Sequence, residues 1–226
     1  MGGQKAVEGD FPFMVALRPS YTPREHGCGG FIISSRWIGS VAHCMLNPLS
    51  HLLVLAVVGT LKTSDPGTVY RFSFWMNHPH YVVSERMNDI GIGRTRSAII
   101  FTPLIQPIPL GSEFIGTGIK SNISGWGTLD YPLPIGRFAE DLHWVELMTI
   151  TNEECKERMI PEERHRIFDE NICTYDGPGV GACNGDSGSP LSAGGAVIGI
   201  VSWALPCARK FVIHFQLFTD IKVCNF

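Results

Sequence analysis

The stretch Cys183-Asn184-Gly185-Asp186-Ser187-Gly188-Ser189-Pro190 is the part of the chain on which the rest of the interpretation depends. A serine between glycines gains little from a helix or a strand. It suits a tight turn in which backbone N–H groups point at one spot beside an exposed hydroxyl. Acyl transfer needs that combination, because the nucleophile must lie beside N–H donors for an oxyanion. A Gly/Ser/Asp-rich surface loop explains this stretch equally well, so the remaining sequence has to decide.

The composition bounds the class of protein. The chain has 226 residues, 44% of them hydrophobic and 17% charged, with a net charge of −3. This is enough apolar sequence for one large domain or two small ones, and too little charge for a disordered chain. Without a Lys/Arg run we expect no nucleic-acid partner, and without 18 consecutive apolar residues we expect no membrane span. Met1-Gly2-Gly3-Gln4 is not a charged-then-apolar leader.

The seven cysteines indicate disulfide bonds. They are Cys28, Cys44, Cys155, Cys173, Cys183, Cys207 and Cys224. No CxxC or Cys/His grouping has zinc-like spacing, so we expect no metal site. Disulfides in a secreted protein are a better explanation than free thiols, and the odd number leaves one thiol over.

Short β-branched and aromatic runs, punctuated by 25 Gly and 15 Pro, predict many short strands. The runs cover residues 13–17, 31–33, 37–41, 53–58, 69–75, 90–92, 114–126, 142–150 and 195–203. One helix is predicted to start at Thr151, in a capping box whose Glu154 reaches back to the N-cap. Many strands with one helix predict an all-β barrel or sandwich.

Two further segments carry candidate functional residues. His43 lies among small residues, directly before Cys44 and beyond a predicted hairpin that follows Cys28. Asp89 lies at the edge of an apolar strand, where an entering carboxylate must be paired or hydrogen-bonded. A histidine N–H would suit it. The alternatives are an ordinary satisfied histidine and a turn-forming Asn88-Asp89 pair.

In this order and spacing, these three segments resemble the chymotrypsin-like (trypsin-fold) serine proteases, with the character of an arthropod chymotrypsin-type member. The resemblance covers essentially the whole chain. Further matches are Cys28-Gly29-Gly30, His78-Pro79-His80-Tyr81, Gln106-Pro107-Ile108, Ser124-Gly125-Trp126-Gly127 and Ile200-Val201-Ser202-Trp203.

The resemblance implies an all-β fold of two six-stranded antiparallel β-barrels packed together. Residues 1–226 would form a single peptidase domain, with the N-terminal barrel at about 1–105 and the C-terminal barrel at about 106–226. One short intermediate helix is expected. The family's C-terminal helix would be truncated, since the sequence stops at Phe226.

The resemblance also implies catalytic roles. Ser187 would be the nucleophile, His43 the base that takes its proton, and Asp89 the group that orients and stabilises the imidazolium. The backbone N–H groups of Gly185 and Ser187 would form the oxyanion hole. Ser202 matches the family serine that hydrogen-bonds the catalytic aspartate.

Substrate preference is expected from the residues matching the family's pocket. These are Gly181, Ala182, Asn184, Ser202, Trp203 and Ala204. The floor position, Gly181, carries no carboxylate to pair with Arg or Lys, so cleavage after those residues is not expected. Ala204 stands where glycine is usual and narrows the pocket modestly. We expect cleavage after apolar residues, with large ones favoured slightly over small ones.

The disulfides implied by the resemblance are Cys28–Cys44, Cys155–Cys173 and Cys183–Cys207, leaving Cys224 as the odd thiol. We expect a secreted, extracellular monomer without cofactors, whose leader is not part of this sequence. Its partners would be peptide or protein substrates and protein protease inhibitors.

Two departures from the family pattern leave other interpretations open. Met1 falls at the second position of the family's mature N-terminus, so its amine is expected to fall about one residue, ~3.6 Å, short of its receptor Asp186. Residues 208–216 replace an expected pocket wall by bulky apolar residues. A zymogen-like form, a non-catalytic homologue acting as a binding or cofactor protein, and a truncated gene record of an active enzyme are the alternatives.

Overall fold

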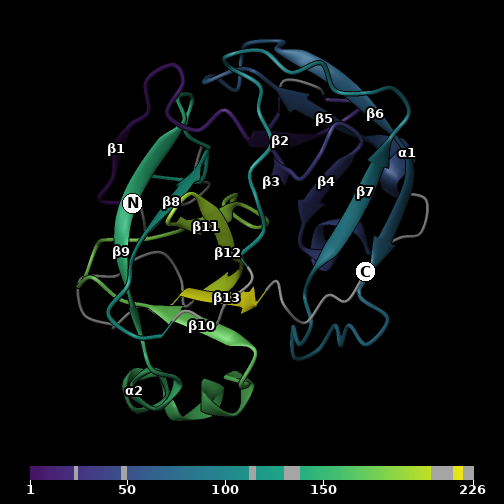
Figure 1. Cartoon of the computed structure of the whole chain (residues 1–226). Helices are drawn as coiled ribbons and strands as arrows, with labels where there is room; N and C mark the ends of the chain where they lie inside the picture. Colours follow the sequence, from purple (N-terminus) through teal and green to yellow (C-terminus); the bar gives the residue numbers. More distant parts are fainter. Residues whose placement is uncertain (23–24, 47–49, 112–115, 130–137, 205–215, 221–226) are drawn as a thin grey trace.

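A computed structural model describes residues 1–22, 25–46, 50–111, 116–129, 138–204 and 216–220. Two β-structures lie side by side in Figure 1. The first is a closed barrel of six antiparallel strands in the order β2-β3-β4-β7-β6-β5. The strands are β2 (Met14–Pro19), β3 (Cys28–Ile32), β4 (Trp37–Ser40), β5 (Val54–Val58), β6 (Thr68–Asn77) and β7 (Gly91–Thr95).

The second β-structure is a seven-stranded sheet in the order β1-β9-β10-β13-β12-β11-β8, in which β8 also pairs with β9 and so closes a six-stranded ring. The strands are β1 (Gln4–Lys5), β8 (Lys120–Gly125), β9 (His143–Ile150), β10 (Asn171–Thr174), β11 (Pro190–Ala193), β12 (Ala196–Ala204) and β13 (Gln216–Asp220). The predicted all-β double barrel is confirmed. Strand β1, which was not predicted, adds the N-terminal residues to the outside of the second ring.

Strand β6 shows how the sequence pattern directs side chains into the first barrel. Tyr70 and Phe72 are buried, while Val69, Arg71 and Ser73 on either side of them are exposed, as expected for a strand with one face in a core. The register shifts between Phe72 and Phe74, so two residues there oppose one on β7. After this bulge the alternation changes phase, and Trp75 packs against the barrel core.

Apolar residues of both barrels meet in a shared cluster. Phe31, Val41 and Ile90 of the first barrel pack with Val197 and Ile200 of the second. All five are nearly inaccessible to solvent. Because Val41 and Ile90 lie next to the segments of His43 and Asp89, this cluster fixes both segments against β12.

The predicted helix forms as α2 (Asn152–Arg158). The Thr151 hydroxyl accepts the backbone N–H of Glu154 at 3.0 Å, which confirms the predicted N-cap. The Glu154 carboxylate pairs with Arg158 at 2.7 Å instead of reaching back to the cap, so that half of the predicted capping box is wrong. This i,i+4 ion pair on the helix surface occupies the carboxylate that the capping box would have used.

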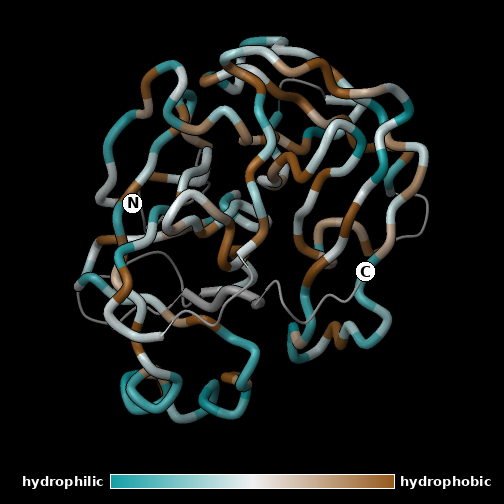
Figure 2. The backbone as a smooth tube through the Cα atoms, in the orientation of Figure 1, coloured by the Kyte–Doolittle hydropathy of each residue, from teal (hydrophilic) through white to brown (hydrophobic). Residues whose placement is uncertain are grey.

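Three further short helical segments were not predicted: η1 (Ala42–Met45), α1 (Ser50–Leu53) and η2 (Pro161–Arg166). Figure 2 shows α2 and the η2 segment as predominantly hydrophilic, in keeping with their place outside the barrels. No helix in the described part of the chain is long and apolar enough to cross a membrane.

Several predictions fall outside the described residues. They concern the pocket-wall segment 208–216 except Gln216, the truncated C-terminal helix before Phe226, the Cys207 end of the predicted Cys183–Cys207 disulfide, and Cys224 as the odd thiol.

Candidate active site

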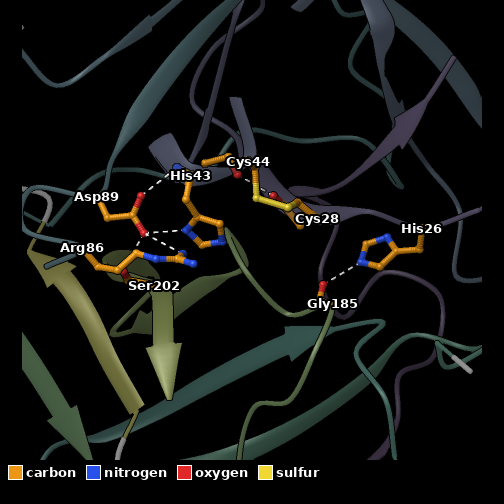
Figure 3. The surroundings of a disulfide bond; sticks show 10 residues. His26, Cys28, His43, Cys44, Arg86, Asp89, Gly185 and Ser202 are labelled. Atoms are coloured by element: carbon orange, nitrogen blue, oxygen red, sulfur yellow. Dashed lines mark hydrogen bonds and ion pairs between the residues drawn. A yellow bond between two sulfur atoms is a disulfide. The ribbon is translucent and has the colours of Figure 1, made fainter. Parts of the chain in front are cut away.

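Asp89 is the buried centre of a hydrogen-bond cluster. It immediately precedes Ile90 and β7, and it is inaccessible to solvent. Its Oδ1 accepts the backbone N–H of His43 at 2.9 Å. Its Oδ2 lies 2.6 Å from Nδ1 of His43 and accepts the Ser202 hydroxyl at 2.6 Å (Figure 3). Since an ionised carboxylate only accepts hydrogen bonds, Nδ1 carries the proton and Nε2 of the neutral ring keeps a lone pair.

His43 is held by η1, directly after β4. Its neighbours Ala42 and Met45 are buried, and Cys44 is joined to Cys28 at the start of β3 by a disulfide with a Cα–Cα separation of 6.5 Å. This bond fixes the histidine segment to β3. The sulfur atoms of Cys28 and Cys44 lie near the His43 ring, but they are bonded to each other and are not thiolate metal ligands.

Ser187 lies in the turn before β11. The Ser187 carbonyl accepts the Gly29 N–H at 2.7 Å, and the Gly188 N–H donates to the carbonyl of Val201 in β12 at 2.8 Å. Gly188 has a φ of +81°, in the region that favours glycine. Gly29 follows Cys28, so the disulfide brings the Ser187 turn and His43 to the same end of β3.

The Ser187 side chain is half-buried. In the described part of the chain its hydroxyl makes no hydrogen bond to His43. Catalytic hydrogen bonds of this kind are commonly long without substrate and tighten in the complex.

The backbone at 185–187 leaves two donors unused. Within the described ranges, no acceptor receives the N–H of Gly185 or that of Ser187. Gly185 has a φ of +95°, which favours glycine at this position. Two uncommitted N–H groups beside a serine hydroxyl have the chemistry required for an oxyanion hole.

Asp186 is buried beside this turn. Its Oδ1 accepts the N–H of Gly127 at 2.8 Å, and its Oδ2 accepts the N–H of Cys183 at 2.9 Å. Burial raises the pKa of the Asp186 carboxyl, while these two bonds and the Met1 amine oppose the rise.

The Met1 amine reaches the same region but bonds elsewhere. It donates to the carbonyl of Gly181 at 2.5 Å, and Gly181 donates back to the Met1 carbonyl at 3.0 Å. Burial lowers the pKa of this amine, and the Asp186 charge opposes the change. A cavity of about 20 Å³ is lined by Met1, Gly181, Asp186 and other residues. No ion pair between Met1 and Asp186 occurs among the described residues.

The predicted pocket residues lie on the segments that flank the Ser187 turn. Gly181 and Ala182 are buried, and Asn184 is exposed with its carbonyl accepting the Thr128 N–H at 2.9 Å. Gly181 itself carries no side chain, and the carboxylate of Asp186 lines the same small cavity as Gly181 and Ala182. The uncharged pocket floor stays a prediction.

The other pocket residues lie near the end of β12. Ser202 turns its side chain toward Asp89, so any contact with substrate would come from its backbone. Trp203 is half-buried, with the Arg166 guanidinium 4.4 Å from its ring centroid. Ala204 is the last residue of β12, and the structure does not describe its side chain.

Two predicted disulfides are confirmed, Cys28–Cys44 and Cys155–Cys173. Cys183 is also disulfide-bonded. Its predicted partner, Cys207, lies outside the described residues.

Three residues near the site were not identified from the sequence. The Arg86 guanidinium lies 3.8 Å from Oδ2 of Asp89, and Arg86 has a φ of +57°. Burial, with a smaller effect of the Asp89 charge, raises the pKa of Tyr81 to about 12. His26 bonds to the carbonyl of Gly185 at 2.7 Å. Tyr81 was noted only as the end of the His78-Pro79-His80-Tyr81 match, without a role in the site. Arg86 lies three residues before Asp89, but no pattern of residue types sets Arg86 or His26 apart from ordinary loop residues.

Comparisons with known proteins agree with this geometry. The trypsin family model matches residues 1–222. Chymotrypsin-2 of Vespa crabro is 34% identical over 209 residues, which covers 92% of this chain and 89% of the relative. Trypsin delta of Drosophila melanogaster is 32% identical over 208 residues (92% and 79%), and trypsin alpha-4 of Lucilia cuprina is 30% identical over 221 residues (98% and 82%).

The double barrel and these matches together show that the chain belongs to the trypsin family of serine proteases. It is a serine-type endopeptidase, and its insect relatives confirm the expected arthropod chymotrypsin-like character.

Proposed function

We propose that the chain is a secreted endopeptidase that hydrolyses peptide bonds through Ser187, His43 and Asp89, and cleaves after apolar residues. Residues 1–226 act as one peptidase domain, with barrels at about 1–105 and 106–226. The proposal is supported above all by the bonds of Asp89, which leave Nε2 of His43 unprotonated at the end of β3 to which the Ser187 turn is attached.

The reaction steps follow from the proton on Nδ1 and the lone pair on Nε2 of His43. Ser187 Oγ attacks the scissile carbonyl carbon as its proton passes to Nε2 of His43, and the imidazolium is stabilised by Asp89. The N–H groups of Gly185 and Ser187 bind the oxyanion. Collapse of the tetrahedral intermediate breaks the C–N bond, and His43 returns the proton to the leaving amine. Water repeats these steps on the acyl-enzyme and restores the Ser187 hydroxyl.

The preference for apolar residues rests on the pocket floor. Gly181 and Ala182 offer no carboxylate to an Arg or Lys side chain, and burying an unpaired cation there would be costly. The relative with 34% identity is named a chymotrypsin, which supports the same preference. The disulfides support secretion, since such bonds persist in oxidising compartments.

An active-site label tests the proposal. Because the Met1 amine bonds to Gly181, the oxidised protein is prepared both as printed and with one isoleucine before Met1. We expect a fluorophosphonate probe to label Ser187 in at least one form, and Ser187→Ala to abolish labelling. A folded protein that is unlabelled in both forms would refute the proposal and favour the non-catalytic homologue.

Substrate preference is measured on the form that is labelled. Peptide anilides that differ only in the residue before the scissile bond carry Phe, Leu, Ala or Arg. We expect kcat/KM to be highest for Phe and Leu, and at least about 100-fold lower for Arg, since an unpaired buried charge costs several kcal/mol. Efficient cleavage after Arg would refute the assignment of Gly181 as the pocket floor.

A further inference from the structure

His26 is a buried polar residue outside the Ser-His-Asp group. It lies just before β3, and the N–H of the following residue, Gly27, donates to the carbonyl of Leu17 at 3.1 Å. The side chain is 3% exposed, although no pattern in the sequence predicts a core position. In Figure 3 its ring points across to Gly185.

The contact between His26 and Gly185 fixes the tautomer of the ring. Nε2 lies 2.7 Å from the carbonyl oxygen of Gly185, which can only accept, so Nε2 carries the proton. Nδ1 of the same ring is buried and has no hydrogen-bond partner among the described residues.

Aromatic residues hold the ring and the glycine together. The ring centroids of Trp126 and Phe138 each lie 5.5 Å from that of His26, and Phe138 meets it edge-on at 85°. Phe138 also covers Gly185, since a Cβ built there would lie 2.7 Å from its ring. Gly185 is therefore held on one side by a hydrogen bond and on another by a ring.

The buried Nδ1 is an unfavourable feature that a purely structural residue would avoid. Phenylalanine, a flat aromatic ring somewhat larger than imidazole, would fill the space between Trp126 and Phe138 without an unpaired polar atom. Leaving a buried polar atom unsatisfied costs about 1–3 kcal/mol. What the imidazole adds over phenylalanine is the donor at Nε2, and that donor is directed at Gly185.

We propose that His26 is a positioning residue for the oxyanion hole, which holds Gly185 by its carbonyl so that the N–H of Gly185 stays turned toward Ser187. This inference rests on the proposed function. Gly185 needs such a restraint because its left-handed φ of +95° is one of several conformations open to glycine. Its N–H also has no acceptor in the described part of the chain that would fix it before substrate arrives.

Two substitutions at His26 separate the donor from the shape. His26→Phe keeps the aromatic packing and removes the donor, whereas His26→Gln keeps an N–H donor of similar reach. Loss of one oxyanion donor costs about 100- to 1,000-fold in kcat in other enzymes, and His26 acts on that donor indirectly. We expect His26→Phe to lower kcat about 10- to 100-fold with KM changed less than threefold, and His26→Gln to restore most of it.

A transition-state analogue supplies a second readout. The affinity for a peptidyl trifluoromethyl ketone, whose adduct places an oxyanion in the hole, should fall in His26→Phe by the same factor as kcat/KM. Val58→Ala, in the core of the first barrel, is the control for lost stability and should leave kcat and this affinity unchanged.

The outcomes are distinguishable. An unlabelled, inactive parent protein overturns the proposed function itself. An active parent with His26→Phe equally active overturns this inference alone, as does a loss of the same size in His26→Gln or a change confined to KM.

Discussion

The Ser202→Ala substitution tests how strongly the environment of Asp89 supports catalysis. Ser202 is 2% exposed and donates to Oδ2 of Asp89 at 2.6 Å. A hydrogen bond to a charged group contributes about 1.5–3 kcal/mol, so we expect the free energy of unfolding to fall by that amount. If the whole of this hydrogen-bond free energy were added to the activation barrier of the catalysed reaction, kcat would fall about 10- to 150-fold. Because the bond is present in both the ground and transition states, this factor is a ceiling.

Ser121→Ala is the matched control. Ser121 is 1% exposed and donates to the backbone carbonyl of Leu147 at 2.9 Å, away from the site. A neutral bond of this kind contributes about 0.5–1.5 kcal/mol, and its loss should leave kcat unchanged.

Two measurements decide this prediction. Unfolding in guanidinium is followed by tryptophan fluorescence in a Ser187→Ala background, which prevents self-digestion. Steady-state hydrolysis of a Phe anilide is measured in the active background. We expect Ser202→Ala to lower kcat at least threefold with KM within twofold, because the hydroxyl faces Asp89 and not substrate. A kcat equal to that of Ser121→Ala would refute the reasoning.

Three other predictions concern stability. Burial, aided by the Arg18 charge and opposed by the bond to Gly185, lowers the pKa of His26 from 6.5 to about 4. As the pH falls from 6.5 to 4, the His26 ring is protonated in the unfolded chain before it is protonated in the folded one, so the free energy of unfolding should drop by about 3 kcal/mol in that window. His26→Gln has no such ring and should flatten this part of a plot of unfolding free energy against pH. Replacing Cys155 and Cys173 by alanine should lower stability by about 3 kcal/mol in guanidinium, and an unchanged midpoint would contradict the loop-closure argument. Arg18→Met, which removes a buried guanidinium bonded to two carbonyls of loop 62–65, should cost about 2–4 kcal/mol by the same assay with kcat retained.

The strands predicted from the sequence are those with continuous β-branched runs. Residues 37–41 and 53–58 form β4 and β5 within a residue or two. Strand β11 was missed, because it starts at Pro190 directly after a segment whose glycines indicate a turn. Its pairing with both β8 and β12 is a tertiary effect that no local pattern carries.

The candidate site was predictable where chemistry requires unusual local sequence. Glycines around Ser187 and the carboxylate at the edge of a strand are conspicuous for that reason. His26 was not predictable, because its role depends on Gly185, a residue 159 positions away in the chain. The same holds for Arg86, whose closeness to Asp89 depends on a left-handed backbone at a residue type that rarely adopts one.

The division of the site between the two barrels has a consequence for the integrity of the enzyme. His43 and Asp89 belong to the first barrel, and Ser187 to the second, while β1 returns the N-terminal residues to the second barrel. A chain cut between β7 and β8 would give two fragments, neither with all three of the residues proposed to act in catalysis. Activity would then return only on reassociation, at a rate set by the product of the two fragment concentrations, and β1 would contribute to the contact that joins them.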